Sequence, residues 1–343
     1  MRLGTGPLNR RRFLVAASLA SALALTGCGT GDQRGGGDEK SVALVTPQKA
    51  GDGGPTDNLI AGLNTLKAAG YTTRHVAAPD PSSHESTLRS LAQSGTPVIV
   101  VSFSDFTQVL KTVAPDFPKT RFVHIYSDPY KPELPNVQTV SFDTQGPSYL
   151  AGVLAATVSK TGVVGFIGGT AIPSLNADYH AFEAGAKATR AGIAVKSAFV
   201  GSFGDPVKGQ QIAQTMFNNK VDVVLAYAGG SSVGVVKAAD QAKTFVIYDN
   251  AESAQTATSV IAVASQHYGA TMAKRVLTIA DGTWKPGGSE AGLADDGTFL
   301  ERAKMFRPGA GALDLDSAFQ KVGETKQKIV DGSVDVPVNT GNV

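Results

Sequence analysis

Carboxylates, aromatic rings and glycines follow several apolar runs of this sequence, and these residue types suit the binding of a small molecule. A carboxylate accepts hydrogen bonds from hydroxyl groups, an aromatic ring stacks on a heterocycle, and a glycine lets backbone N–H groups approach a ligand. The residues concerned are Asp52, Phe103, Tyr126 and Asp128 in the first half of the chain, and Phe203, Gly229, Gly230 and Asp249 in the second. We therefore expect a small polyhydroxylated or heterocyclic ligand.

Some of the acidic residues have a competing structural explanation. Aspartate is a preferred residue at helix N-caps, and Asp52, Asp205 and Asp249 could all serve as caps. For Asp205, directly before Pro206, the two interpretations are equally consistent with the pattern, whereas for Asp249 we favour ligand contact. Phe203 follows two small residues, and a core side chain is expected one position earlier, so we predict that its ring contacts the ligand.

One motif raises the alternative of an enzyme. Residues 230–234 read Gly-Ser-Ser-Val-Gly and fit the G-x-S-x-G turn of α/β-hydrolases, with Asp249 and His267 following Ser232 in the hydrolase order. Such a short pattern arises easily by chance in a chain with 39 glycines, and the same glycines fit a backbone turn that faces a ligand. We therefore predict a binding protein without enzymatic activity and keep a lipid-anchored serine hydrolase as the less favoured alternative.

Composition excludes several other classes of site. The single cysteine among 343 residues rules out an intramolecular disulfide and a cysteine-based zinc site. The histidines lack ligand spacing, and His124 stands in an apolar run, where a buried core imidazole is expected. The sequence has no phosphate loop or dinucleotide fingerprint, and 31 basic against 29 acidic residues give no support for nucleic-acid binding. We predict no metal, no cofactor and no nucleic-acid partner.

The elements that must position the candidate residues alternate between strands and helices. Apolar runs rich in β-branched residues occur at 42–45, 98–101, 122–125, 163–167, 221–226, 245–247 and 260–263. They do not alternate with polar residues, as is typical of strands buried on both faces of a parallel sheet. Helical patterns occur at 57–69, 83–93, 106–113, 147–159, 175–189, 206–217, 232–242 and 268–280. This order predicts right-handed βαβ units.

The number of elements exceeds what one parallel sheet usually holds. We predict an α/β fold of two Rossmann-like lobes, formed by residues 41–145 and 146–250. Residues 251–343 are expected to return and complete the lobes, ending in a C-terminal helix. Ligands of open parallel sheets bind beyond the carboxyl ends of the strands, so the candidate residues should line a cleft between the lobes.

The N-terminal segment has the features of a bacterial export signal. Arg10, Arg11 and Arg12 precede an apolar run over residues 13–25, which is shorter than the ~20 residues that span a membrane. Leu-Thr-Gly-Cys at 25–28 resembles a lipobox, and the arginines resemble a twin-arginine signal, although Sec export would also fit. We predict a signal peptide over 1–27, a lipid on Cys28, a flexible tether over 28–40, and a location on the extracytoplasmic face of the cell membrane.

Motifs of the second lobe carry a more specific resemblance. They are Ser148–Gly152, Ser159–Gly162, Val164–Gly169, Phe182–Ala186, Val200–Asp205 and Ala228–Gly230, followed by Gly234 and Val235. In order and spacing they resemble the basic membrane protein family, the lipid-anchored substrate-binding proteins of ABC transporters, some of which bind purine nucleosides. The resemblance extends over residues 42–288 and implies the type I periplasmic-binding-protein fold. It also implies a monomer that binds a nucleoside-like ligand and delivers it to an ABC permease.

The resemblance further suggests roles for residues of the second lobe. Phe203 matches the aromatic residue that stacks on the base, and Asp249 matches the carboxylate that binds the ribose hydroxyls. Gly229 and Gly230 match a turn that faces the ligand with its backbone.

The first lobe departs from the family pattern. Asp52 keeps an acidic residue, but Gly-Pro-Thr at 54–56 stands where the family has Ser-Phe-Asn, so Phe103 or Tyr126 would have to supply the second aromatic wall. Tyr126 replaces a family aspartate, with Asp128 two residues later, and the family lysine is missing around residues 265–267. We predict nucleoside transport and keep the sensing of a different solute as the alternative.

Overall fold

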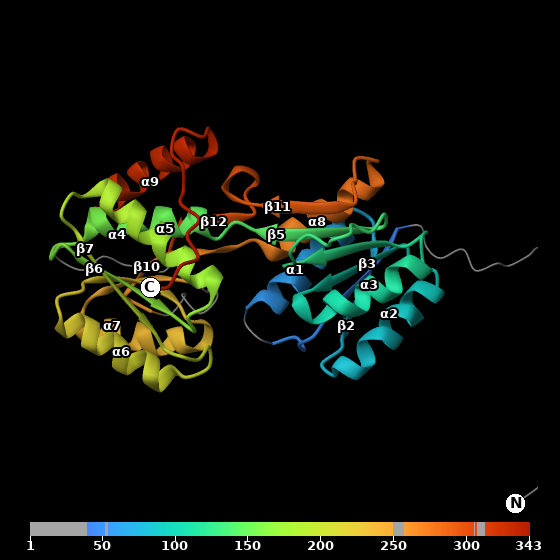
Figure 1. The fold of residues 1–343 in the computed structure, drawn as a ribbon, viewed down its shortest axis with the longest axis horizontal. Helices are drawn as coiled ribbons and strands as arrows, with labels where there is room; N and C mark the ends of the chain where they lie inside the picture. The colour runs from blue at the N-terminus through green and yellow to red at the C-terminus, as the bar shows by residue number, and fades with distance from the viewer. Residues whose placement is uncertain (1–39, 52–53, 250–256, 305, 307–312) are drawn as a thin grey trace, which may run out of the picture. The chain divides into compact units, whose positions relative to one another are not determined.

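A computed structural model describes residues 40–51, 54–249, 257–304, 306 and 313–343. These residues form two six-stranded sheets, each with helices on both faces (Figure 1). Short 3₁₀ helices occur at η1 (Pro81–Ser83), η2 (Ser104–Phe106), η3 (Ala114–Asp116), η4 (Gly229–Ser231) and η6 (Leu293–Asp295).

The first sheet has the strand order β11-β5-β4-β3-β1-β2, and its paired strands are all parallel. The strands are β1 (Ser41–Thr46), β2 (Thr72–Ala77), β3 (Val98–Ser102), β4 (Arg121–Ile125), β5 (Val137–Phe142) and β11 (Gly287–Ala291). Alternate residues of β1 point to opposite faces. Val42 and Leu44 pack with α1 (Pro55–Ala68) and α8 (Tyr268–Ala280), while Ala43 and Val45 pack with α2 (His84–Gln93) and α3 (Thr107–Val113). Burial of both faces explains the continuous apolar runs.

The second sheet has the order β12-β10-β9-β8-β6-β7. Its strands are β6 (Val163–Gly168), β7 (Ala194–Phe199), β8 (Val223–Tyr227), β9 (Phe245–Tyr248), β10 (Val260–Gln266) and β12 (Thr298–Arg302). Strand β12 runs antiparallel to β10, and the other pairs are parallel. The helices of this lobe are α4 (Gln145–Val158), α5 (Pro173–Thr189), α6 (Pro206–Asn218), α7 (Ser232–Ala242) and α9 (Leu315–Val330).

The chain passes between the two sheets at residues 143–144, at His267 and at residues 292–297, which we call the crossover segments. Hydrogen bonds tie them to neighbouring strand ends and to one another. The Asp143 N–H donates to the Ala291 carbonyl, and the His267 N–H donates to the Gly297 carbonyl, both at 2.9 Å. Because of these crossings, α8 and β11 belong to the first lobe, and β10, β12 and α9 belong to the second.

A close helix contact positions the first-lobe side of the site. A Cβ on Gly62 of α1 would lie 2.4 Å from the carbonyl oxygen of Gly269 on α8, so a larger residue would force the helices apart. At this short separation, Asn58 Oδ1 accepts a hydrogen bond from the Gly269 N–H at 2.8 Å. The start of α1 is thereby held beside Tyr268, the first residue of α8.

The prediction of two α/β lobes with parallel cores is confirmed. Strands β2, β5, β7, β11 and β12 were not predicted. Strands β2 and β7 lie at sheet edges and are only partly buried, so they lack the continuous apolar run of a buried strand. Strand β11 reads Gly-Gly-Ser-Glu-Ala and lacks such a run as well. The predicted export signal, Cys28 and most of the tether lie outside the described residues. Within the part of the chain that the structure describes, no helix combines the length and apolar character needed to cross a membrane.

Candidate functional site

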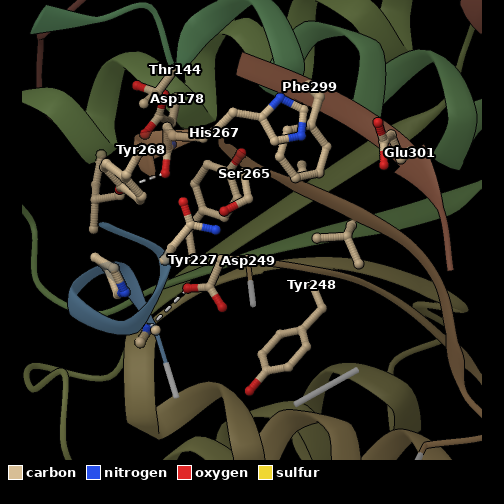
Figure 2. A pocket seen from close by; sticks show the side chains of 18 of the residues that line it. Thr144, Asp178, Tyr227, Tyr248, Asp249, Ser265, His267, Tyr268, Phe299 and Glu301 are labelled. Atoms are coloured by element: carbon tan, nitrogen blue, oxygen red, sulfur yellow. Dashed lines mark hydrogen bonds between the residues drawn. The ribbon is translucent and has the colours of Figure 1, made fainter. Parts of the chain in front are cut away.

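A cavity of about 800 Å³ is lined by residues from both lobes and from the crossover segments, a volume typical of small-molecule sites (Figure 2). Its lining includes Gly54, Pro55, Asn58 and Tyr126 from the first lobe, Thr144, Gln266, His267 and Tyr268 at or beside the crossovers, and Asp178, Phe203, Tyr227, Gly229, Gly230 and Asp249 from the second lobe. Most of these follow the carboxyl ends of parallel strands or begin a helix, as expected for an open α/β sheet.

Phe203 is held by the backbone of a loop that follows β7. Gly169 has no side chain, and a Cβ there would lie 2.3 Å from the Phe203 ring, so the ring occupies this space. The Gly169 carbonyl accepts hydrogen bonds from the Gly201 and Ser202 N–H groups at 2.7 and 3.1 Å, and the Phe203 carbonyl accepts one from Ser231 at 3.2 Å. The ring is 46% exposed and lines the cavity, so it is well placed to stack on a flat ligand.

Asp249 directly follows β9 and, like Phe203, lies next to Gly229. Its Oδ2 accepts a hydrogen bond from the Gly229 N–H at 3.2 Å, whereas its buried Oδ1 has no hydrogen-bond partner among the described residues. Burial raises the pKa of the Asp249 carboxyl to about 7, and the Gly229 N–H offsets only part of this rise. An unsatisfied carboxylate oxygen at a cavity wall is suited to accept a hydrogen bond from a hydroxyl or ammonium group of a ligand.

The helix-cap interpretation is confirmed for Asp205. Its side chain caps α6 by accepting a hydrogen bond from the Lys208 N–H at 2.9 Å. Asp249 instead bonds to Gly229, twenty residues earlier in the chain.

Asp178 and Tyr227 line the cavity but were not predicted from the sequence. Asp178, on α5, is 3% exposed, and its Oδ1 accepts hydrogen bonds from Gln145 Nε2 and Ser148 Oγ, each at 3.3 Å. Burial raises its pKa to about 6, although neighbouring hydroxyl and amide donors counteract this. The buried Tyr227 hydroxyl at the end of β8 has no hydrogen-bond partner within the described chain. In the sequence, the one signal for Asp178 was an acidic residue on the buried face of the predicted helix 175–189.

The first-lobe wall is aromatic. Tyr126 is 44% exposed and makes edge contacts with Phe103 and Tyr268, each at 5.8 Å between ring centroids. Phe103 and Tyr126 have φ values of 66° and 61°, a left-handed conformation that is rare for bulky residues and often accompanies functional sites. His124 supports this backbone, because its Nε2–H donates to the Phe103 carbonyl at 2.7 Å and its Nδ1 accepts from the Tyr130 hydroxyl. Burial lowers the His124 pKa to about 4, so this imidazole is neutral, as expected for a core histidine.

The structure brings together part of the predicted site. Tyr126, Phe203, Gly229, Gly230 and Asp249 line one cavity. Phe103 is partly buried and contacts the Tyr126 ring, whereas Asp128 is exposed. Neither residue is part of the cavity lining. Asp52 lies outside the described residues, so its role stays a prediction.

The proposed hydrolase residues are arranged differently from a catalytic triad. Ser232 is fully buried, and its Oγ accepts a hydrogen bond from the Ala228 N–H at 2.9 Å, so a substrate would not reach it. His267 donates from Nδ1 to the Asp296 carbonyl at 2.8 Å and stacks on Phe299 at 4.1 Å. The His267 imidazole is therefore engaged by residues of the crossover segment 292–297 and of the strand that follows it. The described residues contain no group of three His, Cys, Asp or Glu side chains that could hold a metal ion.

Comparison with known proteins gives a match over most of the chain. Residues 40–339 match the family model Bmp, described as ABC transporter substrate-binding protein PnrA-like. The chain is 28% identical to Basic membrane protein A1 of Borrelia garinii over 58% of this chain. The matched region covers 60% of that relative, which is less than two thirds of its length. It is 27% identical to the CD4+ T-cell-stimulating antigen of Listeria innocua, over 96% of this chain and 99% of the relative. It is 30% identical to the ABC transporter nucleoside-binding protein BmpA of Lactococcus lactis, over 66% of this chain and 68% of the relative.

Solved structures show the same fold. An ABC transporter solute-binding protein from Conexibacter woesei superposes with a TM-score of 0.75 at 22% identity, covering 88% of this chain and 99% of the other. A solute-binding protein of an ABC transporter system from Aeropyrum pernix gives a TM-score of 0.70 at 20% identity, covering 87% and 93%. At these identities the similarity establishes the fold and leaves the ligand open.

Proposed function

We propose a function from one premise: this chain belongs to the Bmp family, the PnrA-like substrate-binding proteins of ABC transporters. Proteins of this kind act outside the cytoplasm. We infer that this member binds a nucleoside in the cavity and delivers it to an ABC permease. The observation that carries the inference is the half-exposed Phe203 ring beside the unsatisfied Asp249 Oδ1 on one cavity wall.

The chemistry of this wall matches the two halves of a nucleoside. A nucleobase has a flat aromatic face that stacks on Phe203, and such stacking contributes ~1–3 kcal/mol per base. The ribose has hydroxyl groups that donate to Asp249 Oδ1, an oxygen without another partner in the described chain. Tyr126, on the first lobe, is the exposed aromatic residue available for the other face of the base. Support also comes from the Lactococcus lactis relative, whose name is that of a nucleoside-binding protein.

The crossover segments suit a mechanism of binding by lobe closure. A ligand that contacts both lobes stabilises the closed arrangement over the open one, and the segments between the lobes absorb the motion. Closure would place the ligand away from water, where stacking and hydroxyl–carboxylate hydrogen bonds discriminate most strongly. The ligand leaves unchanged when the permease opens the receptor.

We propose that the receptor is tethered to the membrane through a lipid on Cys28. The support is the lipobox-like sequence and the glycine-rich segment that follows it. A shift in mass on globomycin treatment of cells, or on Cys28→Ala, tests this tether, and an unchanged mass in both would contradict it.

The ligand is tested by mass spectrometry of small molecules released when the purified mature chain is denatured, followed by calorimetry with a nucleoside panel. We expect a purine or pyrimidine nucleoside to co-purify or to bind. A different solute, with no nucleoside binding, would overturn the nucleoside assignment and favour a receptor for another solute class. A structure with the nucleoside stacked on Phe203 would further test the assigned contacts.

A further inference from the structure

Acidic groups on the inner wall of the cavity lack a basic partner. Asp178 Oδ1 accepts hydrogen bonds from an amide and a hydroxyl group, and Asp249 Oδ2 accepts one from a backbone N–H. Asp143, in the first crossover segment, lies close enough to Asp178 to raise its pKa by repulsion. None of the interactions given for Asp178 or Asp249 in the described chain comes from Lys, Arg or His. These acidic side chains therefore face the cavity without a basic countercharge among the interactions given for them.

The basic residues of the lining are Arg302, Lys304 and His267, and none of them is among the interactions given for Asp178 or Asp249. Arg302, at the end of β12, pairs with Asp316 through Nη1 and Oδ1 at 2.5 Å, and Lys304 follows the same strand. Glu301 lies beside them, so this region contains charges of both signs.

The Tyr227 hydroxyl lies within electrostatic range of both Asp178 and Asp249. It is buried, has no hydrogen-bond partner among the described residues, and lines the cavity with the two carboxylates (Figure 2). A phenol oxygen can accept a hydrogen bond from a ligand donor, and the rings of Tyr126 and Tyr268 also line the cavity. Acidic oxygens together with tyrosine rings are the surroundings that stabilise an organic cation.

We propose that Asp178, Tyr227 and Asp249 form a subsite for a cationic nitrogen of the ligand, such as a primary ammonium group. This inference extends the proposed function by specifying the ligand as an amino-substituted nucleoside, with its ammonium group among these three residues. An ammonium group has three donors, which match the unsatisfied Asp249 Oδ1, the unsatisfied Tyr227 oxygen and the carboxylate of Asp178. Burial has raised the pKa of both carboxyls, so a bound cation would stabilise their charged forms.

A neutral ligand would satisfy this wall less well. Ribose hydroxyls can donate to Asp249, but they supply no positive charge to stabilise the ionised carboxylates, whose pKa values burial has raised. A positive charge provides both the missing donors and the missing countercharge. The two ligand types are therefore distinguished by charge rather than by shape.

The test compares adenosine with 5′-amino-5′-deoxyadenosine, which differ by a hydroxyl and a protonated amine, by calorimetry near neutral pH. We expect the amino nucleoside to bind at least about tenfold more tightly to the mature chain. In Asp178→Asn the ratio of the two dissociation constants should fall to about one or two. Tyr227→Phe should also reduce the ratio, and because the Tyr227 hydroxyl has no partner in the described chain, this variant should fold even if Asp178→Asn does not.

Asp205→Asn is the matched control. It removes the same charge from the same lobe, asparagine is an equally good helix cap, and Asp205 is not among the cavity lining. The ratio should therefore stay at the wild-type value. A wild-type ratio near one, or an equal loss of preference in Asp205→Asn, would overturn the subsite.

The failure of the nucleoside assignment is separable from the failure of the subsite. If neither nucleoside binds, thermal shift is measured with glucosamine and putrescine against glucose and 1,4-butanediol. Stabilisation by an amine only, lost in Asp178→Asn, would retain the cationic subsite and reject the nucleoside. Equal or absent stabilisation by amines and their uncharged counterparts would reject the subsite.

Discussion

The two lobes build their sides of the cavity in different ways. The second-lobe wall is made of short turns at strand ends. The Ser231 N–H donates to the Phe203 carbonyl, the Gly169 carbonyl holds the two residues before Phe203, and the Gly229 N–H donates to Asp249. The first-lobe wall depends on Tyr126, whose ring contacts Tyr268 and Phe142 from distant parts of the chain. Backbone hydrogen bonds between strand-end turns therefore define one wall, and packing between aromatic rings defines the other. We expect substitutions in the second wall to act mainly on binding, and those in the first wall to act on binding and stability together.

Removal of the Asp249 carboxylate should have the largest effect on the second wall. Asp249→Asn removes the charged acceptor while keeping the shape of the side chain, and hydrogen bonds to charged groups contribute ~1.5–3 kcal/mol. We expect a loss of roughly ten- to a hundredfold in ligand affinity by calorimetry. Asp205→Asn serves as the control with the same charge change. Unchanged affinity in Asp249→Asn would remove this residue from the site.

Truncation of Phe203 should have the next largest effect. Loss of ~1–3 kcal/mol of stacking predicts a roughly five- to hundredfold weaker affinity for a nucleoside. Because the ring is half exposed, the melting temperature of the ligand-free protein should change little. Val207→Ala is a suitable control, since Val207 is exposed on the neighbouring α6 and is not among the cavity lining. Equal effects of the two variants would contradict stacking on Phe203.

Truncation of Tyr126 should weaken binding less but should also affect stability. We expect Tyr126→Ala to weaken nucleoside binding about two- to tenfold, because Tyr268, which contacts Tyr126 and also lines the cavity, retains part of the aromatic wall. The loss of its contacts with Phe103, Phe142 and Tyr268 should lower the melting temperature of the ligand-free protein. A binding defect as large as that of Phe203→Ala, with no change in stability, would erase the contrast between the walls.

The last prediction concerns the pH dependence of stability rather than ligand affinity. The Asp249 pKa is raised from 3.8 to about 7 in the folded protein, so the folded state holds a proton that the unfolded state releases between these values. The contribution of Asp249 to the free energy of unfolding should therefore fall as pH rises from about 4 to about 7. Asp249→Asn lacks this contribution, so its melting temperature relative to that of the wild type should be higher near pH 8 than near pH 4. Thermal melts at both pH values test this, and a relative melting temperature that is no higher near pH 8 would contradict the raised pKa.

Much of the second-lobe wall could be predicted from the sequence. Glycines beside an aromatic residue and an aspartate after apolar runs mark strand-end turns, whose geometry depends on a few neighbouring residues. The same rule also selected Phe103 and Asp128, which are not among the cavity lining. A strand end specifies where a residue lies, but the direction of its side chain depends on backbone torsions, such as the φ of 66° at Phe103.

Asp178 could not be predicted as part of the site, because its position depends on how α5 packs against α4. Its neighbours Gln145 and Ser148 come from that other helix, and no local pattern reveals their proximity. Tyr227 reads as the last core residue of a buried strand, and its unsatisfied hydroxyl becomes apparent only when all surrounding groups are placed. Strand β11 likewise lacks a strand pattern, and its pairing with β5 supplies the structure that its own residues do not favour.

The sequence by itself determined the class of fold and the strand-end turns that carry Phe203, Gly229, Gly230 and Asp249, because runs of β-branched residues and strand-end glycines act through local conformation and burial. Only the tertiary structure decided that Asp178, Tyr227 and Asp249 line one cavity and that Ser232 is buried. The physical reason is that charge compensation and solvent access depend on residues distant in sequence. These properties arise only when the helices and sheets are packed together.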